Sequence, residues 1–451
     1  MNLKEIVNKN QDGLIKDLIK LLQIDTVLVE QPENKEAPFG NGIRDALLYV
    51  LELGESMGFK TKNVENIAGH IEFGEGDEII GVLCHLDVVP AGDGWTYPPF
   101  SGTVVGDKLF ARGALDDKGP LMSSLYALKA LKDSGVKLTK KVRLIIGTDE
   151  ETDWRGINRY LEVCEMPDMA FSPDAEFPLI YGEKGIMSID ILSDYKDDNL
   201  VNLTSGERYN VVPEKTVANF KELELDKFAS FVKENKFKGE LEDLSSSKEI
   251  VLYGVGAHAM EPDNGVNSLV NLCTFLKDEV KNPLIKFVGE NLTDSRFRKL
   301  GLDFTDPEMG DLTVNVALAR LSKDGGHVGL NLRYPINWDK DKFLAKLETE
   351  AKAYDLKVKV TKDSNPHYVD KKSDLVRKLH VAYMKHTNDL GSPLMTIGGG
   401  TYARALKNAV AFGMLMPGRE DVVHQVDEYI YISDLLLSTV IFAEAIYSLG
   451  K

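Results

Sequence analysis

The chain has 451 residues, a length that predicts at least two domains rather than one hydrophobic core. Its 43% hydrophobic and 28% charged residues are typical of a globular protein. The formal net charge of −17 argues against nucleic acid or an anionic membrane surface as a partner, because both attract Lys and Arg. Three cysteines without a CxxC pair predict neither a disulfide framework nor a cysteine zinc site. We therefore expect a reducing, cytoplasmic location.

The two ends of the chain show helical patterns. The N-terminal segment alternates apolar and charged residues and has no continuous apolar run, which predicts a surface helix rather than a signal peptide. The C-terminal segment SDLLLSTVIFAEAIYSLG is interrupted by Asp434 and Glu444. We expect it to be too short and too polar to span a bilayer.

The first part of the chain alternates helical and strand-like patterns. Helices are expected around 14–22, 43–57 and 118–134, and strands near 67–73, 79–84, 142–147 and 169–172. Three of these strands run directly into acidic or histidine-containing turns. This alternation of strand and helix predicts a largely parallel sheet.

The pattern changes after residue 185. Alternating Ile186, Ser188, Asp190 and Leu192 predict a half-solvated antiparallel strand. Further strands are expected at 312–318, 328–333 and 356–360, with a helix at 340–354 and a charged helical region at 269–300. This order resembles a split βαβ, ferredoxin-like unit.

From about residue 373 the pattern returns to an amphipathic helix, a glycine-rich loop (IGGGTYAR), an apolar strand at 410–415 and a terminal helix capped by Ser433. We therefore expect an α/β protein with a split catalytic domain, residues 1–185 and 371–451, built on a mostly parallel mixed sheet flanked by helices. Residues 186–370 would form an inserted α+β ferredoxin-like lid.

Two motifs near residues 81–120 carry the first candidate functional residues. GVLCHLDVVP places His85 and Asp87 two positions apart after an apolar strand, so that both side chains point to the same side. An imidazole that binds a metal through one nitrogen usually donates its other N–H to a carboxylate or carbonyl group, a role that suits Asp87. LFARGALDDKGP adds the adjacent carboxylates of Asp116 and Asp117, which suggest a cation site.

Polar residues at the ends of the expected strands form a candidate metal-binding set: His85, Asp116, Glu151, Asp174 and, from MPGREDVVHQVDE, His424. Two imidazoles and three carboxylates suit two divalent ions bridged by one carboxylate. The absence of thiolates disfavours softer ions and leaves zinc, manganese or cobalt, of which zinc is the expected metal. Glu150, beside Glu151, would face a water molecule as general base.

Each motif also has a structural interpretation. The Glu150–Glu151 pair alone is typical of a solvated turn, and Asp116–Asp117 alone of a helix N-terminus, where carboxylates are favoured by the dipole. A single histidine is more often a surface or core residue, and we interpret His70, His327, His367, His380 and His386 in that way. The metal hypothesis is favoured because all five groups occur together at strand ends, and burying them without a cation would be costly.

Eight segments together resemble a known family: HLDVVP, ARGALDDKGP, TDEET, SPDAEFP, GERYNVVPEKTVANF, GAHAMEPDNGVNS, IGGGTYAR and MPGREDVVHQVDE. They are similar to the dinuclear-metal dipeptidases of the PepV type, within the broader group of carnosinases, carboxypeptidase G, aminoacylases and succinyl-diaminopimelate desuccinylase. One departure follows TDEET, where Asp153-Trp154-Arg155-Gly156 stand in place of the small residues of many relatives.

The resemblance implies a role for each of these residues. His85, Asp116 and Asp174 would hold one ion, and Asp116 would bridge to a second ion held by Glu151 and His424, with a cis peptide between Asp116 and Asp117. Asp87 would orient His85, and Glu150 would activate the water.

From the lid, the resemblance implies that His258 stabilises the oxyanion and that Asn210 and Arg333 bind substrate. The backbone of Gly399, Gly400 and Thr401 would hold the substrate's terminal carboxylate. From the residues alone, Arg333 could equally be a surface ion-pair residue and Asn210 a turn former.

The function expected from the resemblance is hydrolysis of the peptide bond of dipeptides with a free N-terminus, including β-Ala-His, with two divalent ions per chain. The alternative within the same superfamily is an N-acyl amino acid deacylase or desuccinylase. A binding protein without activity on the same scaffold would require a missing ligand or base, and none is missing. The expected partner is a small peptide substrate, with no nucleic acid or membrane, and the expected state is a monomer.

Overall fold

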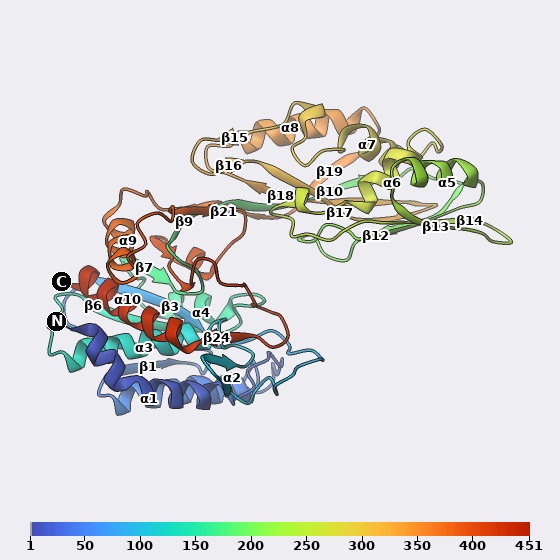
Figure 1. Ribbon diagram of the computed structural model, residues 1–451. Helices are drawn as coiled ribbons and strands as arrows, with labels where there is room; N and C mark the ends of the chain where they lie inside the picture. The colour runs from blue at the N-terminus through green and yellow to red at the C-terminus, as the bar shows by residue number, and fades with distance from the viewer. Residues whose placement is uncertain (1) are drawn as a thin grey trace. The chain divides into compact units, whose positions relative to one another are not determined.

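The computed structural model describes residues 2–451, and the chain divides into two compact units. Unit 1 contains the chain up to Tyr181 together with Val369–Met395 and Gly400–Lys451. Unit 2 contains Gly182–Tyr368 and the short segment Thr396–Gly399. Figure 1 shows the elements of each unit.

The sheet of unit 1 is mixed, and its middle is parallel. In spatial order it contains β1 (Lys60–Val64), β2 (Ala68–Phe73), β6 (Lys141–Gly147), β3 (Ile79–His85), β7 (Met169–Ser172) and β22 (Ala409–Ala411). The three pairs β6–β3, β3–β7 and β7–β22 are parallel, whereas β1 pairs with β2 and β2 with β6 in the antiparallel sense. Every residue of β3 is buried, as expected for an apolar strand covered on both faces. The mixed sheet predicted from the sequence is confirmed, and its parallel pairs are confined to β6, β3, β7 and β22.

The helices of unit 1 are α1 (Leu3–Leu22), α2 (Asn41–Ser56), α3 (Lys118–Asp133), α4 (Arg155–Val163), α9 (Asp374–Thr387) and α10 (Ile432–Gly450). α1, α3 and α10 pack against one another. α1 confirms the helix predicted for the N-terminal segment and extends well before the residues around 14–22; the side chain of Asn2 caps it by accepting from the N–H of Glu5. α4 and β1 were not predicted.

The last helix differs from its prediction in two ways. Ser433 does not cap it: the N-cap is Tyr431, and the Ser433 hydroxyl donates to Asp107 at 2.6 Å. By length and composition alone α10 could cross a membrane, so the prediction that it is too short and too polar is wrong. More than half of its most apolar window, 56%, is nevertheless buried inside the structure, against α3 and α9, as in a core helix.

Unit 2 is built on an antiparallel sheet. In spatial order it contains β13 (Lys238–Asp243), β14 (Lys248–Tyr253), β12 (Lys215–Phe220), β11 (Leu200–Ser205), β17 (Thr313–Ser322), β18 (Gly325–Tyr334), β10 (Gly185–Ser193) and β19 (Lys357–Ser364). β10 pairs with β18 and β19 in the antiparallel sense, which confirms the change of strand type predicted after residue 185.

Four helices of unit 2 lie on one face of this sheet (Figure 1): α5 (Leu225–Glu234), α6 (Ser268–Leu276), α7 (Pro283–Asn291) and α8 (Lys340–Lys352). Their apolar side chains and those of the sheet form one core, which includes Phe220, Phe287 and Leu330. The helical region expected at 269–300 contains α6 and α7, of which α6 is apolar and mostly buried. The predicted α/β fold with an inserted α+β unit is confirmed.

Short elements complete the structure: β4 (Thr103–Val105), β5 (Lys108–Phe110), β8 (Ala175–Glu176), β9 (Ile180–Glu183), β15 (Thr305–Asp306), β16 (Gly310–Asp311), β20 (His367–Tyr368), β21 (Met395–Ile397), β23 (Met414–Leu415), β24 (Tyr429–Tyr431), and the 3₁₀ turns η1 (Pro262–Asn264), η2 (Arg298–Leu300) and η3 (Tyr402–Ala405). β24, β5 and β4 form a small separate sheet. This sheet joins the segment before Asp116 to the segment after His424.

His70 on β2 is a core histidine, as interpreted from the sequence. Its Nδ1 lies 2.7 Å from the Tyr160 hydroxyl of α4. Burial, with the nearby Arg143, lowers the pKa of His70 to about 4. The unfolded chain binds a proton near pH 6.5, so unfolding takes up a proton between these values, and stability falls as pH falls from about 6.5 to about 4.

In the wild type, protonation of His70 on unfolding should lower the free energy of unfolding by about 3 kcal/mol between pH 6.5 and pH 4. We predict that His70→Gln abolishes this part of the pH dependence. Urea unfolding of the wild type and the variant between pH 4.5 and pH 7 measures it, with the half-exposed His327→Gln of unit 2 as control. The two curves should converge as pH falls. Curves that stay parallel over this range would show that His70 is not the titrating group.

Candidate metal centre

The polar residues of the candidate site follow strands that run side by side. β3 ends at His85, β6 is followed by Thr148 to Glu151, and β7 is followed by Pro173 and Asp174. Because β3 is parallel to both β6 and β7, the three ends lie at the same edge of the sheet. The strand register therefore places these side chains near one another.

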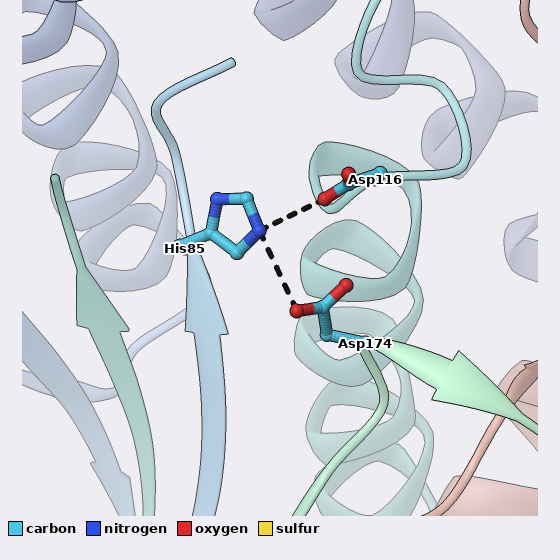
Figure 2. A group of neighbouring side chains, drawn as sticks. All are labelled: His85, Asp116 and Asp174. Atoms are coloured by element: carbon cyan, nitrogen blue, oxygen red, sulfur yellow. Dashed lines mark hydrogen bonds and ion pairs between the residues drawn. The ribbon is translucent and has the colours of Figure 1, made fainter. Parts of the chain in front are cut away.

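Two carboxylates, those of Asp116 and Asp174, face the same ring nitrogen of His85 (Figure 2). Its Nε2 is 2.9 Å from Asp116 Oδ1 and 3.6 Å from Asp174 Oδ2. Asp116 comes from the loop just before α3, where its peptide bond to Asp117 is cis, as the family resemblance implied. His85 is fully buried, so these carboxylates are its polar environment.

A second group shares Asp116. His424 Nε2 lies 2.9 Å from Asp116 Oδ2 and 3.0 Å from Glu151 Oε1. His424 is in the loop between β23 and β24, at a positive φ of 63°. The two oxygens of Asp116 thus face two different imidazoles, so this carboxylate is common to both groups.

The two groups have the composition and spacing of metal ligands. In each group, one donor atom per residue lies within 4.8 Å of the others. Ligands on one tetrahedral zinc ion, about 2.0–2.2 Å from the metal, are separated by roughly 3.3–3.5 Å. The observed distances of 2.9 to 3.6 Å are close to that separation. Imidazole and carboxylate donors without thiolate fit zinc, manganese or cobalt.

Charges at the site shift the pKa of each histidine upward. Burial alone would lower the pKa of His85, but its contacts with Asp116, Asp174 and Asp87 outweigh burial and raise it. Contacts with Asp116 and Glu151 raise the pKa of His424 to about 10. Without other cations, these imidazoles would carry the positive charge that the clustered carboxylates require.

Glu150, the predicted base, lies beside this cluster but is in neither group of candidate ligands. Burial, together with the carboxylates of Asp174 and Glu151, raises the pKa of Glu150 well above its ordinary value. A carboxyl group with a raised pKa next to candidate metal ligands is suited to accepting and returning a proton.

Two further aspartates hold the ligands in place. His85 Nδ1 lies 2.9 Å from the backbone carbonyl of Asp87 and 3.6 Å from its carboxylate, so the carbonyl is the nearer partner. Asp87 Oδ2 accepts from the backbone N–H of Glu151 at 3.1 Å. Asp117 Oδ2 accepts from the backbone N–H of His85 at 2.8 Å, a contact that its place in the Asp-Asp pair did not reveal.

The residues that depart from the family pattern support the turn that carries Glu150. Arg155 donates from Nε to Asp149 Oδ2 at 2.7 Å and from Nη2 to Oδ1 at 2.9 Å, and Asp149 is fully buried. Trp154 packs its ring against Tyr402, with centroids 5.5 Å apart. Sequence analysis did not predict this role, although the positions directly follow TDEET.

The substrate-binding residues predicted in unit 2 are grouped within that unit. Asn210 lies in an exposed turn, and its carbonyl accepts from Ala259 next to His258 at 2.9 Å. Burial, with the nearby Arg333, lowers the pKa of His258. Arg333 is 3% exposed, so its alternative interpretation as a surface ion-pair residue is wrong. Its Nε donates to Asn331 at 2.8 Å and its Nη1 to the Gly398 carbonyl at 2.9 Å.

The glycine-rich loop lies at the boundary of the units. Gly399 belongs to unit 2, whereas Gly400 and Thr401 belong to unit 1. Thr401 caps η3, its hydroxyl accepting from the N–H of Ala403 at 3.3 Å. The next residue, Tyr402, packs against His85 with ring centroids 5.8 Å apart, so this loop also contacts the candidate site within unit 1.

A split α/β unit with an inserted α+β unit, and two ligand groups joined by one aspartate, are features of a metal-dependent hydrolase. Comparison with known proteins identifies the family: residues 81–448 match the model of Peptidase family M20/M25/M40, and the chain belongs to this family. It is therefore a hydrolase that acts on peptide bonds.

Curated relatives match over the whole chain. The putative dipeptidase YtjP of Bacillus subtilis is 44% identical over 469 residues, covering 99% of both proteins. The putative dipeptidase MW1694 of Staphylococcus aureus is 41% identical over 464 residues, again covering 99% of both.

Solved structures with low identity share the fold. Human carnosine dipeptidase 1 aligns with a TM-score of 0.58 and 14% identity, over 99% of this chain and 98% of that one. Aminoacylhistidine dipeptidase from Vibrio alginolyticus aligns with a TM-score of 0.58 and 14% identity, over 97% of this chain and 95% of that one.

We predict that Arg155→Met destabilises unit 1 by about 1–3 kcal/mol, because it leaves the buried Asp149 carboxylate short of donors. It should also lower kcat, since the affected turn carries Glu150. The control is Arg159→Met in the same helix, whose partners Glu65 and Glu162 are exposed, and it should change little. Urea unfolding and peptidase assays measure both effects; equal stability of the two variants would contradict the prediction.

Proposed function

We propose that this protein is a dipeptidase that cleaves the peptide bond of dipeptides with a free N-terminus, β-Ala-His included, with two divalent ions. Zinc is the proposed metal, with manganese or cobalt as alternatives. Family membership and the two relatives named putative dipeptidases support the reaction class. The observation that carries the proposal is the shared Asp116, with an imidazole near each of its oxygens and Glu150 alongside.

The residues present fit two ions. His85, Asp116 and Asp174 would hold one, and Asp116, Glu151 and His424 the other. Such a pair of ions, when bound, lowers the pKa of a water molecule and polarises a carbonyl oxygen. Asp87 and Asp117 would hold the ligand residues in position. The Asp87 carbonyl lies near the His85 Nδ1 and its carboxylate accepts from the Glu151 N–H, whereas Asp117 accepts from the His85 N–H.

Glu150 is the proposed proton carrier. As a carboxylate it takes a proton from the attacking water and returns it to the nitrogen of the leaving amine. Burial, together with repulsion from Asp174 and Glu151, raises the pKa of Glu150 and favours its uptake of that proton. Cations bound among the same carboxylates would lower the pKa of Glu150, so that Glu150 would be ionised again before the next cycle.

Residues of unit 2 complete the proposal. His258 would donate a hydrogen bond to the substrate carbonyl oxygen, where negative charge develops. Asn210 and Arg333 would bind the substrate, and the backbone of Gly399, Gly400 and Thr401 would hold its terminal carboxylate. In this scheme unit 1 is the catalytic domain and unit 2 the lid of a cytoplasmic monomer.

We predict that Glu150→Ala lowers kcat by about 10²- to 10⁴-fold, because the proton carrier is lost. Its metal content should stay at the wild-type level. The matched control is the neighbouring Glu151→Ala, which should lose metal as well as activity. Metal analysis and kinetics of both purified variants separate the roles. Equal metal loss in the two variants would show that Glu150 is a ligand.

Substrate assays test the reaction itself. We predict that the chelated enzyme is inactive, that added zinc or manganese restores activity, and that free dipeptides are cleaved faster than their N-acetylated forms. A panel of dipeptides, each assayed with and without the acetyl group, measures this preference. Faster hydrolysis of N-acyl amino acids would instead assign the protein to the deacylases.

A further inference from the structure

A buried ion pair connects the two loops that carry Asp116 and His424. Arg112 Nη1 lies 2.7 Å from Glu428 Oε2, and the two side chains are 2% and 0% exposed. Arg112 follows β5 and precedes Asp116 by a few residues, and Glu428 lies between His424 and β24. The pair therefore joins two segments that lie 316 residues apart in the chain.

Glu428 holds the backbone at Asp116. Its Oε1 accepts from the N–H of Leu115 at 2.9 Å and from the N–H of Asp116 at 3.2 Å. Its Oε2 accepts from Arg112. Both carboxylate oxygens are thus used, and one of them fixes the main chain of the residue that the two ligand groups share.

Arg112 holds the backbone at His424. Its Nη2 donates to the His424 carbonyl at 3.4 Å, and its Nη1 donates to the Gln425 carbonyl at 3.2 Å. The planar, forked guanidinium can reach several acceptors in fixed directions, which an ammonium group does less well. The guanidinium also lies over the ring of Trp95, 5.2 Å from its centre.

We propose that Arg112 and Glu428 are positioning residues that set the spacing between Asp116 and His424, and so the affinity of the centre for its second ion. Neither side chain belongs to the candidate ligand groups. The inference rests on the proposed two-metal function. A buried ion pair is in general weak evidence for stability, because its desolvation offsets much of its attraction. The Arg112–Glu428 pair instead contacts the backbone of the candidate ligands Asp116 and His424, which suits it to position them.

The competing explanation is a purely structural ion pair, and the chain offers a matched control. Arg143 and Glu72 form a pair of the same chemistry in unit 1, with Arg143 Nε 2.8 Å from Glu72 Oε2 and side chains 9% and 14% exposed. It joins β2 to β6 near the beginning of β6, whereas Glu150 and Glu151 follow the end of β6. Breaking this control pair should affect stability without affecting the ligand loops.

The experiment measures metal binding directly. The full-length wild type, Glu428→Gln, Arg112→Met, Glu72→Gln and Arg143→Met are stripped with a chelator and titrated with zinc, and separately with manganese, in competition with a fluorescent chelator. Melting temperatures of the metal-free and metal-loaded forms are recorded in parallel. Glu428→Gln keeps an oxygen that can accept from Leu115 and Asp116 but loses the charge that attracts Arg112.

We expect Glu428→Gln and Arg112→Met to bind the weaker ion about 10- to 100-fold less tightly, the loss typical when a partner of a ligand is removed. The rise in melting temperature on metal addition should shrink in both. Glu72→Gln and Arg143→Met should lower the melting temperature of the metal-free protein, with metal affinities within about threefold of the wild type. The double variant Arg112→Met/Glu428→Gln should lose no more affinity than the larger single effect, because the two residues act as one unit.

Wild-type metal affinity in both variants would overturn the inference, as would an equal loss in the Glu72 and Arg143 controls. A wild type that binds neither zinc nor manganese would instead overturn the proposed function. Should Arg112→Met not fold, Arg112→Lys takes its place: it keeps the charge but not the forked donors, and the same loss of affinity is expected.

Discussion

The structure of this site depends on one carboxylate placed between two imidazoles. Asp116 offers Oδ1 to His85 and Oδ2 to His424, each at 2.9 Å. A displacement of Asp116 therefore changes the environment of both histidines at once. Because Asp174 and Glu151 add two more carboxylates nearby, the cluster requires positive charge, from protonated imidazoles or from bound cations.

The sheet of unit 1 provides the positions that this carboxylate needs. Parallel β3, β6 and β7 end at one edge, so His85, Glu151 and Asp174 lie at the same edge of the sheet. Asp116 and His424 come from loops outside these strands, and they require separate supports. The small sheet of β5 and β24 and the pair of Arg112 and Glu428 are such supports.

Much of the fold and the candidate ligand set could be predicted from the sequence. Long apolar or periodic segments, such as β3, α3 and β10, were placed within a few residues, because burial of one face dominates their pattern. Errors occurred where the pattern is set by other forces. Ser433 was expected to cap α10 but lies inside it, and the short helix α4 was not predicted.

Individual side-chain contacts, within one turn or between distant segments, could not be predicted from the sequence. Arg155 appeared only as a departure from the family pattern, and its contact with the buried Asp149 depends on the fold of one tight turn. Arg112 and Glu428 stand inside recognised motifs, but nothing in their spacing indicates that they meet. The expected roles of Asn210, His258, Arg333 and the glycine-rich loop stay predictions, because no observation here tests them.

The order of the sheet has a consequence for synthesis of the chain. β22 lies beside β7, although all of Gly182–Tyr368 is made between them. During translation, the first ligand group can therefore exist on a nascent chain whose central sheet still lacks a strand. The second group must wait for residue 424. Metal capture at the later group would thus distinguish finished polypeptide from prematurely released fragments, which carry the first group and Glu151 but lack His424.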